Sequence, residues 1–206
     1  MFITFEGGEG TGKTTLIALV KKELESKGYN VILTREPGGS GSLFAESIRQ
    51  LVLDPKYTNV NPYTEALLYA ASRAQHLDEV ILPALKNKTI VLCDRYLDSS
   101  LAYQAFAREL GLDFILNINK YALDHLPNLT FYIDLDPEIG LKRIKGRDKI
   151  DRLDQEKLTF HQKVRSGYLE VAKKFDDRIM TIDGDQSIDN IAKIMLDSIM
   201  SKIWVT

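Results

Sequence analysis

The stretch GGEGTGKTT, residues 7–15, carries the plainest chemical signal in the chain. It completes the pattern GxxxxGK[ST] between an apolar segment and a helical one. In such a loop, backbone N–H groups and a helix N-terminus surround a phosphate, the lysine reaches the β- and γ-phosphates, and the hydroxyl ligates Mg²⁺. A turn with chance glycines is the alternative. The predicted nucleotide-phosphate site consists of Gly7, Gly8, Glu9, Gly10, Thr11, Gly12, Lys13, Thr14 and Thr15, with the Lys13 ammonium exposed to phosphate rather than packed.

Two charged residues close another apolar segment, IVLCD (90–94). Asp94 ends the segment, where a carboxylate can hold or polarise Mg²⁺ directly or through water. Arg95 follows at once, and a side chain at the carboxyl end of a strand faces the crevice where α/β sheets bind ligands. We therefore interpret Asp94 as a metal residue and Arg95 as a catalytic residue. A surface ion pair is the alternative for Arg95.

The elements that must position these residues follow from the hydrophobic pattern. Short apolar runs rich in β-branched and aromatic residues predict strands buried on both faces of a parallel sheet, at 1–6, 31–35, 90–94, 129–135 and 179–183. Helices are predicted at 13–27, 62–86, 114–125, 137–145, 159–175 and 187–203, with Asn61 and Asp113 as caps and a kink or end at Pro83. This βαβα order predicts a single α/β domain over 1–206, a three-layer P-loop fold with a parallel five-stranded sheet flanked by helices.

Composition excludes several classes of protein. The 206 residues are 44% hydrophobic and 27% charged, as in ordinary globular domains. The net charge of -2 gives no basic field for nucleic acid or membrane. The single cysteine, Cys93, permits no intrachain disulfide and favours a buried packing role. We see no signal peptide and no apolar run of the roughly 20 residues that a membrane helix needs, so we expect a cytoplasmic protein.

Five motifs together resemble thymidylate kinases (dTMP kinases) of the bacterial type. In chain order they are FEGGEGTGKTT, TREPGG, EALLYAASRAQH, DRYLDSSLAYQ and DRLDQE. The resemblance runs nearly end to end and is weakest at 54–61 and after about 185. It implies transfer of the γ-phosphoryl group of ATP to dTMP with Mg²⁺, in dTTP synthesis, by a homodimer formed through helix faces. The alternatives are another nucleoside-monophosphate or deoxynucleoside kinase, and a P-loop regulatory switch.

The resemblance also implies how dTMP is held. Arg73 and Arg95 would clamp its 5′-phosphate, with Arg49 near the same pocket, because planar guanidinium groups suit phosphate oxygens. Gln104 would read the thymine edge, since an amide can donate and accept at once. The other implied substrate residues are Tyr69, which would stack on thymine where the family usually has Phe; Ser100 and its neighbour Ser99 near the base; Tyr103, which would pack on the sugar and disfavour a 2′-hydroxyl; and Glu36, near the phosphates and metal.

Glu9 places a carboxylate inside an anion-binding loop. Because backbone amides bind the phosphates, its side chain can point toward the acceptor, and the resemblance implies a hydrogen bond from the deoxyribose 3′-hydroxyl. The loop has no arginine, so charge on the transferring group must be neutralised from elsewhere. Residues 142–152 include six Lys or Arg and resemble the mobile lid of the bacterial type, about 142–154, with Gly146 as hinge. We expect Arg152 first and Arg147 second as its catalytic arginines; a solvated basic helix face is the alternative.

No protein base is required by this chemistry. The acceptor is a phosphate monoester oxygen that is largely ionised near neutral pH. Positioning and charge neutralisation would carry the reaction. The three histidines, His76, His125 and His161, show no metal-ligand spacing, and we interpret them as structural.

Overall fold

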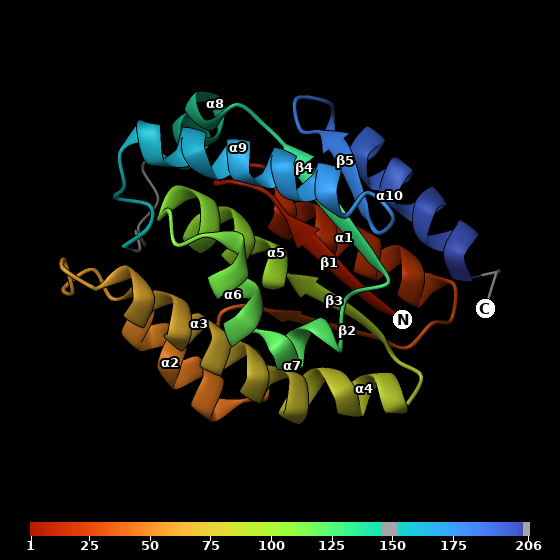
Figure 1. Ribbon diagram of the computed structural model, residues 1–206. Helices are drawn as coiled ribbons and strands as arrows, with labels where there is room; N and C mark the ends of the chain where they lie inside the picture. The colour runs from red at the N-terminus through yellow and green to blue at the C-terminus, as the bar shows by residue number, and fades with distance from the viewer. Residues whose placement is uncertain (146–151, 204–206) are drawn as a thin grey trace.

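The computed structural model describes residues 1–145 and 152–203. Its sheet contains five parallel strands in the order β2-β3-β1-β4-β5 (Figure 1). The strands are β1 (Phe2–Glu6), β2 (Val31–Arg35), β3 (Ile90–Asp94), β4 (Leu129–Asp134) and β5 (Ile179–Asp183). The parallel five-stranded α/β fold is confirmed, and all strand positions agree with the sequence pattern to within one residue.

Alternate residues of the central strands enter two separate cores. Phe2, Val91 and Tyr132 belong to one core, whereas Ile3 and Leu92 belong to the other. This division follows from the period of two residues along a strand. Because each face needs a cover, helices pack on both sides and give three layers.

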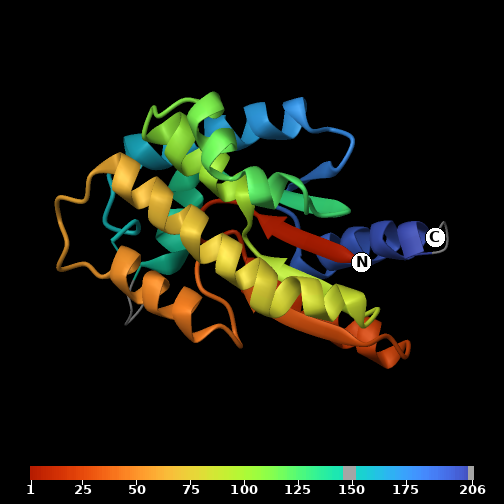
Figure 2. The same ribbon diagram turned by 60° about the horizontal axis from the view of Figure 1, so that its bottom comes forward.

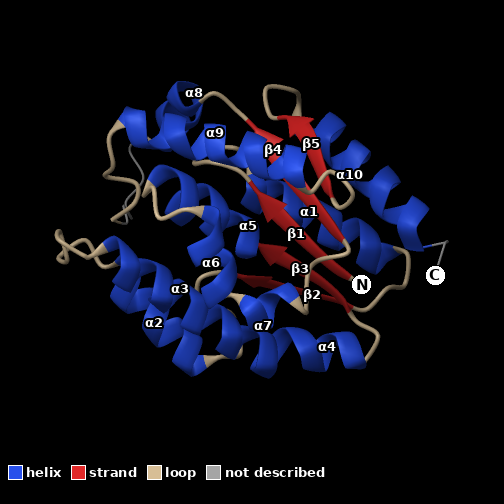
Figure 3. Ribbon diagram, in the orientation of Figure 1, coloured by secondary structure: helices blue, strands red, loops and turns tan. Residues whose placement is uncertain are grey.

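The covering helices divide between the two faces, as Figure 3 shows. On one face lie α1 (Lys13–Ser26) and α10 (Ile188–Ile203), which contact each other. The other face carries α9 (Leu158–Lys174), α5 (Leu97–Ser100) and the π-helical segment Leu101–Ala107 that continues α5. Helix α8 (Pro137–Ile144) follows β4 and packs against α9.

A long helical rod flanks the sheet beside β2 and β3 (Figure 2). It consists of α3 (Pro62–His76), a π-helical segment (Leu77–Ile81) and α4 (Leu82–Lys86). Asn61 caps the rod as predicted, by accepting hydrogen bonds from the N–H groups of Tyr63 and Thr64. Pro83 does not end the rod, which continues to Lys86; it directly follows the π-helical segment, where the α-helical hydrogen-bond pattern is already interrupted.

Three details of the sequence interpretation were wrong or incomplete. Helix α2 (Leu43–Leu53) and the helical turns over 97–107 were not anticipated. The helix expected at 114–125 starts earlier and is split into α6 (Leu112–Ile118) and α7 (Lys120–Leu123) at Asn119. Gly111 precedes α6 at a φ of 81°, so Asp113 lies inside the first turn and is not the cap. Cys93 is buried and free, as expected.

Within the described ranges, no helix combines the length and the apolar character needed to cross a bilayer.

Candidate active site

A cleft of about 770 Å³ opens at the carboxyl ends of β1 and β3. The phosphate loop follows β1, and Asp94 and Arg95 end β3, so the parallel topology brings the two signals together. Of the residues predicted for the site, the cleft is lined by Glu9, Gly10, Thr11, Gly12, Lys13, Thr14, Thr15, Glu36, Arg49, Tyr69, Arg73, Asp94, Arg95, Ser99, Ser100, Tyr103 and Gln104. Gly7, Gly8 and Arg152 are described but do not line it, and Arg147 lies outside the described residues.

Lys13 begins α1 and turns back over the loop. Its Nζ donates to the carbonyls of Gly7 (3.0 Å) and Gly8 (2.9 Å) and to Thr11 Oγ1 (3.3 Å). The residue is only 8% exposed, so the expectation of an exposed ammonium was wrong: the loop carbonyls enclose it. Burial, followed by the charge of Arg95, lowers the Lys13 pKa to about 8, although Asp94 and Glu9 oppose the shift.

The loop needs glycine where its backbone is left-handed or crowded. Gly10 has a φ of 69°, and a Cβ there would lie 2.1 Å from the carbonyl oxygen of Gly140. The contact is reciprocal, since a Cβ on Gly140 would lie 2.1 Å from the carbonyl oxygen of Glu9. The tip of the phosphate loop therefore rests directly on the backbone of α8.

Glu9 pairs with Arg95 across the cleft. Arg95 Nη2 donates to Glu9 Oε1 at 2.6 Å, and the Tyr103 hydroxyl donates to the same oxygen at 3.3 Å. Burial raises the Glu9 pKa, but the charges of Arg95 and Lys13 outweigh burial and lower it overall. The Arg95 guanidinium also lies over the Tyr103 ring, 5.2 Å from its centroid. The carboxylate is thus held by two side chains that come from outside the phosphate loop.

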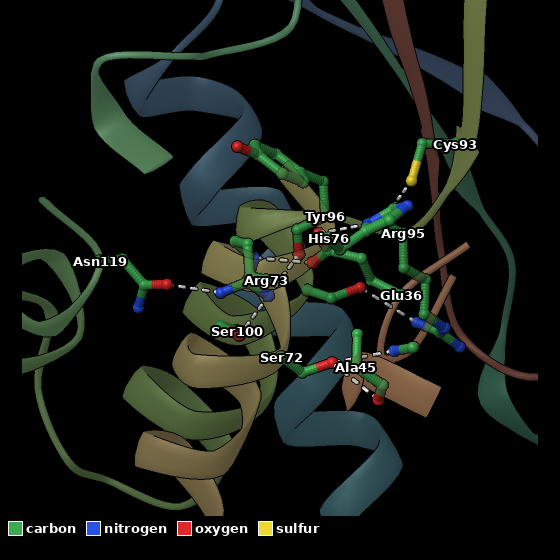
Figure 4. A network of polar contacts seen from close by, with 12 residues as sticks. Glu36, Ala45, Ser72, Arg73, His76, Cys93, Arg95, Tyr96, Ser100 and Asn119 are labelled. Carbon is green, nitrogen blue, oxygen red and sulfur yellow. Dashed lines mark hydrogen bonds and ion pairs between the residues drawn. The ribbon is translucent and has the colours of Figure 1, made fainter. Parts of the chain in front are cut away.

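Arg73 lies deeper and is almost fully engaged by protein acceptors (Figure 4). Its Nε donates to Glu36 at 2.7 Å, Nη1 to Asn119 at 2.6 Å, and Nη2 to Ser100 (2.9 Å) and the Tyr96 carbonyl (3.1 Å). Four of its five donors are therefore used. One of these partners, Ser100, is a residue expected at the base.

Glu36 joins Arg73 to a buried histidine. Its second oxygen lies 3.2 Å from His76 Nδ1 (Figure 4). His76 Nε2 lies 2.6 Å from Thr34 Oγ1. His76 has no exposed surface, so these contacts agree with the predicted structural role. His161 is also buried, while His125 is partly exposed and packs edge-on against Tyr121.

Gln104 belongs to a buried ionic cluster that the sequence interpretation missed. Its Nε2 donates to Glu65 Oε1 at 2.8 Å, and the Arg108 Nε (3.3 Å) and Arg152 contact the same carboxylate. Glu65 is 1% exposed. Glu65 and Tyr69 are four residues apart and share one side of α3, but the sequence does not show that Glu65 is buried and therefore needs cationic partners.

Arg152 is held away from the phosphate loop in this structure. Its Nη2 pairs with Glu65, and its Nε donates to the carbonyl of Val52 at 3.1 Å, at the end of α2. The intervening part of the expected lid, residues 146–151, lies outside the described residues. On the near side, Arg143 of α8 reaches the Gly10 carbonyl at 3.4 Å.

The residues present fit a magnesium ion. Asp94 Oδ1 is buried and has no hydrogen-bond partner among the described residues, and Asp94 and Thr14 both line the cleft. No cluster of three His, Cys, Asp or Glu able to hold a metal occurs within 1–145 and 152–203. This sparse set suits Mg²⁺, which keeps waters and uses one or two protein ligands with substrate phosphates.

Comparison with known proteins identifies the family. The thymidylate kinase family model matches residues 5–194. The chain belongs to the thymidylate kinase family. It is 58% identical over 205 residues to the thymidylate kinase of Acholeplasma laidlawii, covering 98% of this chain and 100% of that protein. Identity to the thymidylate kinase of a Geobacillus species is 52% over 98% and 97% of the two chains, and to that of onion yellows phytoplasma 52% over 95% and 94%.

Family membership establishes the reaction class. A thymidylate kinase is a phosphotransferase of nucleotide biosynthesis that phosphorylates dTMP with ATP as phosphate donor. The predicted enzyme, its substrate and its donor are thereby confirmed, and the alternative kinases and the regulatory switch find no support.

Proposed function

We propose that ATP and dTMP bind end to end in the cleft, with the Glu9–Arg95 pair at their boundary. The ATP phosphates occupy the loop at Lys13, and dTMP occupies the half of the cleft that contains Tyr69 and Gln104. The observation that carries this proposal is the 2.6 Å contact between Glu9 and Arg95, because it joins the tip of the donor loop to the end of β3. A phosphoryl group at this point would lie between the two nucleotides.

The roles of the arginines in the dTMP half of the cleft follow from how many of their N–H donors are already bound to protein acceptors. Arg95 uses three of its five donors within the described residues and lies beside the phosphate loop, so it suits the 5′-phosphate, with Arg49 assisting. Within the described residues, the contacts of Arg73 leave one of its donors unused, which suits a single carbonyl oxygen better than a bidentate phosphate clamp. We therefore narrow the clamp expected from Arg73 and Arg95 to Arg95, and we place Arg73 with Ser100 near the base.

Glu65 gives Gln104 a defined orientation toward the base. The carboxylate accepts from one of the two Nε2 hydrogens, so the amide oxygen and the second N–H remain, and the oxygen can accept a hydrogen bond in the cleft. Thymine carries a ring N–H donor that matches this acceptor. Tyr69 stacks on the ring, and Tyr103 with Glu9 packs on the sugar, where the 3′-hydroxyl donates to the Glu9 carboxylate.

Magnesium would be held by Thr14 and Asp94, directly or through water, together with ATP phosphates. The ion supplies charge neutralisation on the phosphates when bound. Lys13 adds a positive charge at the donor phosphates, and Arg95 orients the acceptor oxygen for in-line attack. No side chain needs to remove a proton, since the acceptor oxygen is already ionised.

The charge on the transferring group comes, in this proposal, from the lid. We propose that Arg152, and after it Arg147, approach the phosphoryl group when both nucleotides are bound. Arg152 would exchange its contact with Glu65 for the phosphoryl oxygens, leaving Glu65 paired with Arg108 and Gln104. An arginine in this position contributes roughly 10³-fold or more in rate.

A homodimer is the proposed assembly, and the cytoplasmic nucleotide pool that supplies dTTP is the proposed setting. Large apolar side chains are exposed on the outer surfaces of α2 and α3, among them Phe44 (63%), Leu51 (45%) and Leu67 (51%). Such a patch favours a protein partner. Sedimentation equilibrium of the wild-type chain, with Phe44→Glu as the dissociating variant, measures the assembly.

An acceptor panel tests the proposed function. With ATP and Mg²⁺, coupled ADP release is compared for dTMP, dUMP, dCMP, dGMP and thymidine. The proposal requires the highest kcat/KM for dTMP and a large loss for dCMP, whose ring nitrogen lacks the N–H that Gln104 accepts. Equal or better use of another acceptor would overturn the assignment.

A further inference from the structure

Glu6, the last residue of β1, is fully buried and does not line the cleft. Its Oε1 accepts a hydrogen bond from the Tyr96 N–H at 2.7 Å. Its Oε2 accepts from the hydroxyls of Ser99 at 2.5 Å and Tyr168 at 2.8 Å. These donors belong to the turn after β3, to α5 and to α9, so one carboxylate joins three separate parts of the fold.

Both hydroxyls also contact Arg95. Arg95 Nη1 donates to Ser99 Oγ at 3.3 Å and to the Tyr168 hydroxyl at 3.1 Å. A guanidinium can only donate, so each hydroxyl must turn a lone pair toward it and direct its single proton elsewhere. The two hydroxyls lie 2.8 Å apart, and each also lies within hydrogen-bond distance of Glu6 Oε2. The Glu6 carboxylate can therefore accept the proton of either hydroxyl, which keeps both oxygens as acceptors for Arg95.

The backbone of Arg95 is fixed from the same strand. Its φ is 69°, a left-handed conformation that is unfavourable for a residue with a Cβ. The Arg95 N–H donates to the Phe5 carbonyl at 2.9 Å, and the following N–H, of Tyr96, donates to Glu6. The last two residues of β1 therefore hold the peptide groups on both sides of this strained residue.

We propose that Glu6 is a positioning residue for phosphoryl transfer, which fixes the Arg95 guanidinium at the boundary between the two nucleotides through Ser99, Tyr168 and the Tyr96 N–H. The inference rests on the proposed role of Arg95 at the dTMP phosphate. This role differs from a packing role. Loss of a packing residue would lower the stability of the protein without lowering kcat/KM for dTMP more than the use of ATP.

Glu6→Gln is the primary variant, assayed at pH 8. Burial and then Asp98 raise the Glu6 pKa to about 7, so at pH 8 the wild-type carboxylate is mostly ionised. Gln keeps the shape but replaces one acceptor oxygen by a donor, so either the Tyr96 N–H or both the Ser99 and Tyr168 hydroxyls lose their partner. We expect kcat/KM for dTMP to fall about tenfold or more, as for hydrogen bonds to charged groups, with little change in KM for ATP.

A double-mutant cycle separates positioning from general damage. If Glu6 acts through Arg95, Glu6→Gln should add almost no further loss in an Arg95→Lys background. The same full loss in both backgrounds would overturn the inference. If Arg95→Lys itself left dTMP use unchanged, the proposed role of Arg95 would fall and the inference with it. If Arg95→Lys lost activity with dTMP while Glu6→Gln was folded and fully active, the inference about Glu6 would be overturned and the proposed role of Arg95 would stand.

Two tyrosines keep the test decisive if Glu6→Gln does not fold. Tyr168→Phe removes one Arg95 acceptor and should lower kcat/KM for dTMP in the same direction. Tyr132→Phe is the matched control, because the Tyr132 ring stacks on Tyr168 at 4.9 Å while its hydroxyl donates to Asp134 at 2.9 Å. Equal losses in both tyrosine variants, or no loss in Tyr168→Phe, would overturn the inference.

Discussion

Opposite charges lie together in the lining of the cleft. Lys13 is held by loop carbonyls, and Glu9 is held by Arg95 and Tyr103. Prearranged partners of this kind reduce the reorganisation needed when phosphates arrive. The residue types of this set follow from the sequence, but the enclosure of Lys13 does not, because it depends on how the loop closes over α1.

Lys13→Ala should abolish turnover, because the variant lacks the cation at the donor phosphates. It should not unfold the ligand-free protein, since the buried ammonium has a lowered pKa and is destabilising while it is charged. The folded pKa of about 8 lies below the unfolded value, so wild-type stability should rise relative to the variant as pH increases from 8 to 10, by about 2 kcal/mol. Turnover assays and urea unfolding at both pH values measure this, and retained activity would refute the loop assignment.

Glu9→Gln should weaken use of dTMP far more than binding of ATP. Gln removes the charge that pairs with Arg95 at 2.6 Å and weakens the acceptor for the 3′-hydroxyl. We expect kcat/KM for dTMP to fall by roughly 10- to 100-fold, the scale of a charge-assisted hydrogen bond. Steady-state kinetics with each nucleotide varied in turn provide the measurement. A change confined to ATP would contradict the placement of Glu9 at the acceptor.

At the scale of elements, α8 and the phosphate loop are in direct backbone contact. Gly10 and Gly140 leave no room for a side chain between them. The position of α8 therefore depends on the loop that holds the donor phosphates. Since α8 leads into the expected lid, the start of the lid depends on that loop as well. A sequence pattern could not show this contact, since the two glycines are 130 positions apart and no periodicity relates them.

Gly140→Ala should displace either α8 or the loop tip, because the added Cβ would meet the Glu9 carbonyl oxygen at 2.1 Å. We expect weaker ATP binding, by about tenfold for a displacement costing about 1.4 kcal/mol. Fluorescent-nucleotide titration measures it. Ile139→Ala, a partly exposed position on the same helix, is the control and should bind ATP normally. Normal binding by Gly140→Ala would show that the contact relaxes without consequence.

The ends of α2 and α3 hold Arg152 at the other side of the cleft. Arg152→Ala should lower kcat more than either KM, because the proposed role of Arg152 begins only as the phosphoryl group transfers. Arg108→Ala is the matched control, since Arg108 also pairs with Glu65 but does not belong to the lid segment. It should change KM for dTMP through Gln104 and leave kcat largely intact. An effect of Arg152→Ala on KM alone would restrict Arg152 to supporting Glu65.

At the scale of the whole molecule, the sheet and most helices were predictable and the buried ionic clusters were not. The strands carry long apolar runs, and α3 has an Asn61 cap followed by a proline, so local rules were sufficient. Helix α2 was missed because a glycine-rich segment precedes it. Glu6 and Glu65 look like ordinary charged positions in one dimension, and only the three-dimensional fold supplies the partners that make their burial tolerable. Most of the residues that line the cleft were predicted, because the loop and the motifs have fixed spacing, whereas Gln50, Leu53 and Tyr96 were not.

The most direct test of the account is a crystal structure with dTMP, Mg²⁺ and a non-hydrolysable ATP analogue. The account predicts the dTMP phosphate within hydrogen-bond distance of Arg95, the thymine ring between Tyr69 and Gln104, and the analogue phosphates in the loop at Lys13. A structure with dTMP bound away from Arg95 and Gln104 would contradict it.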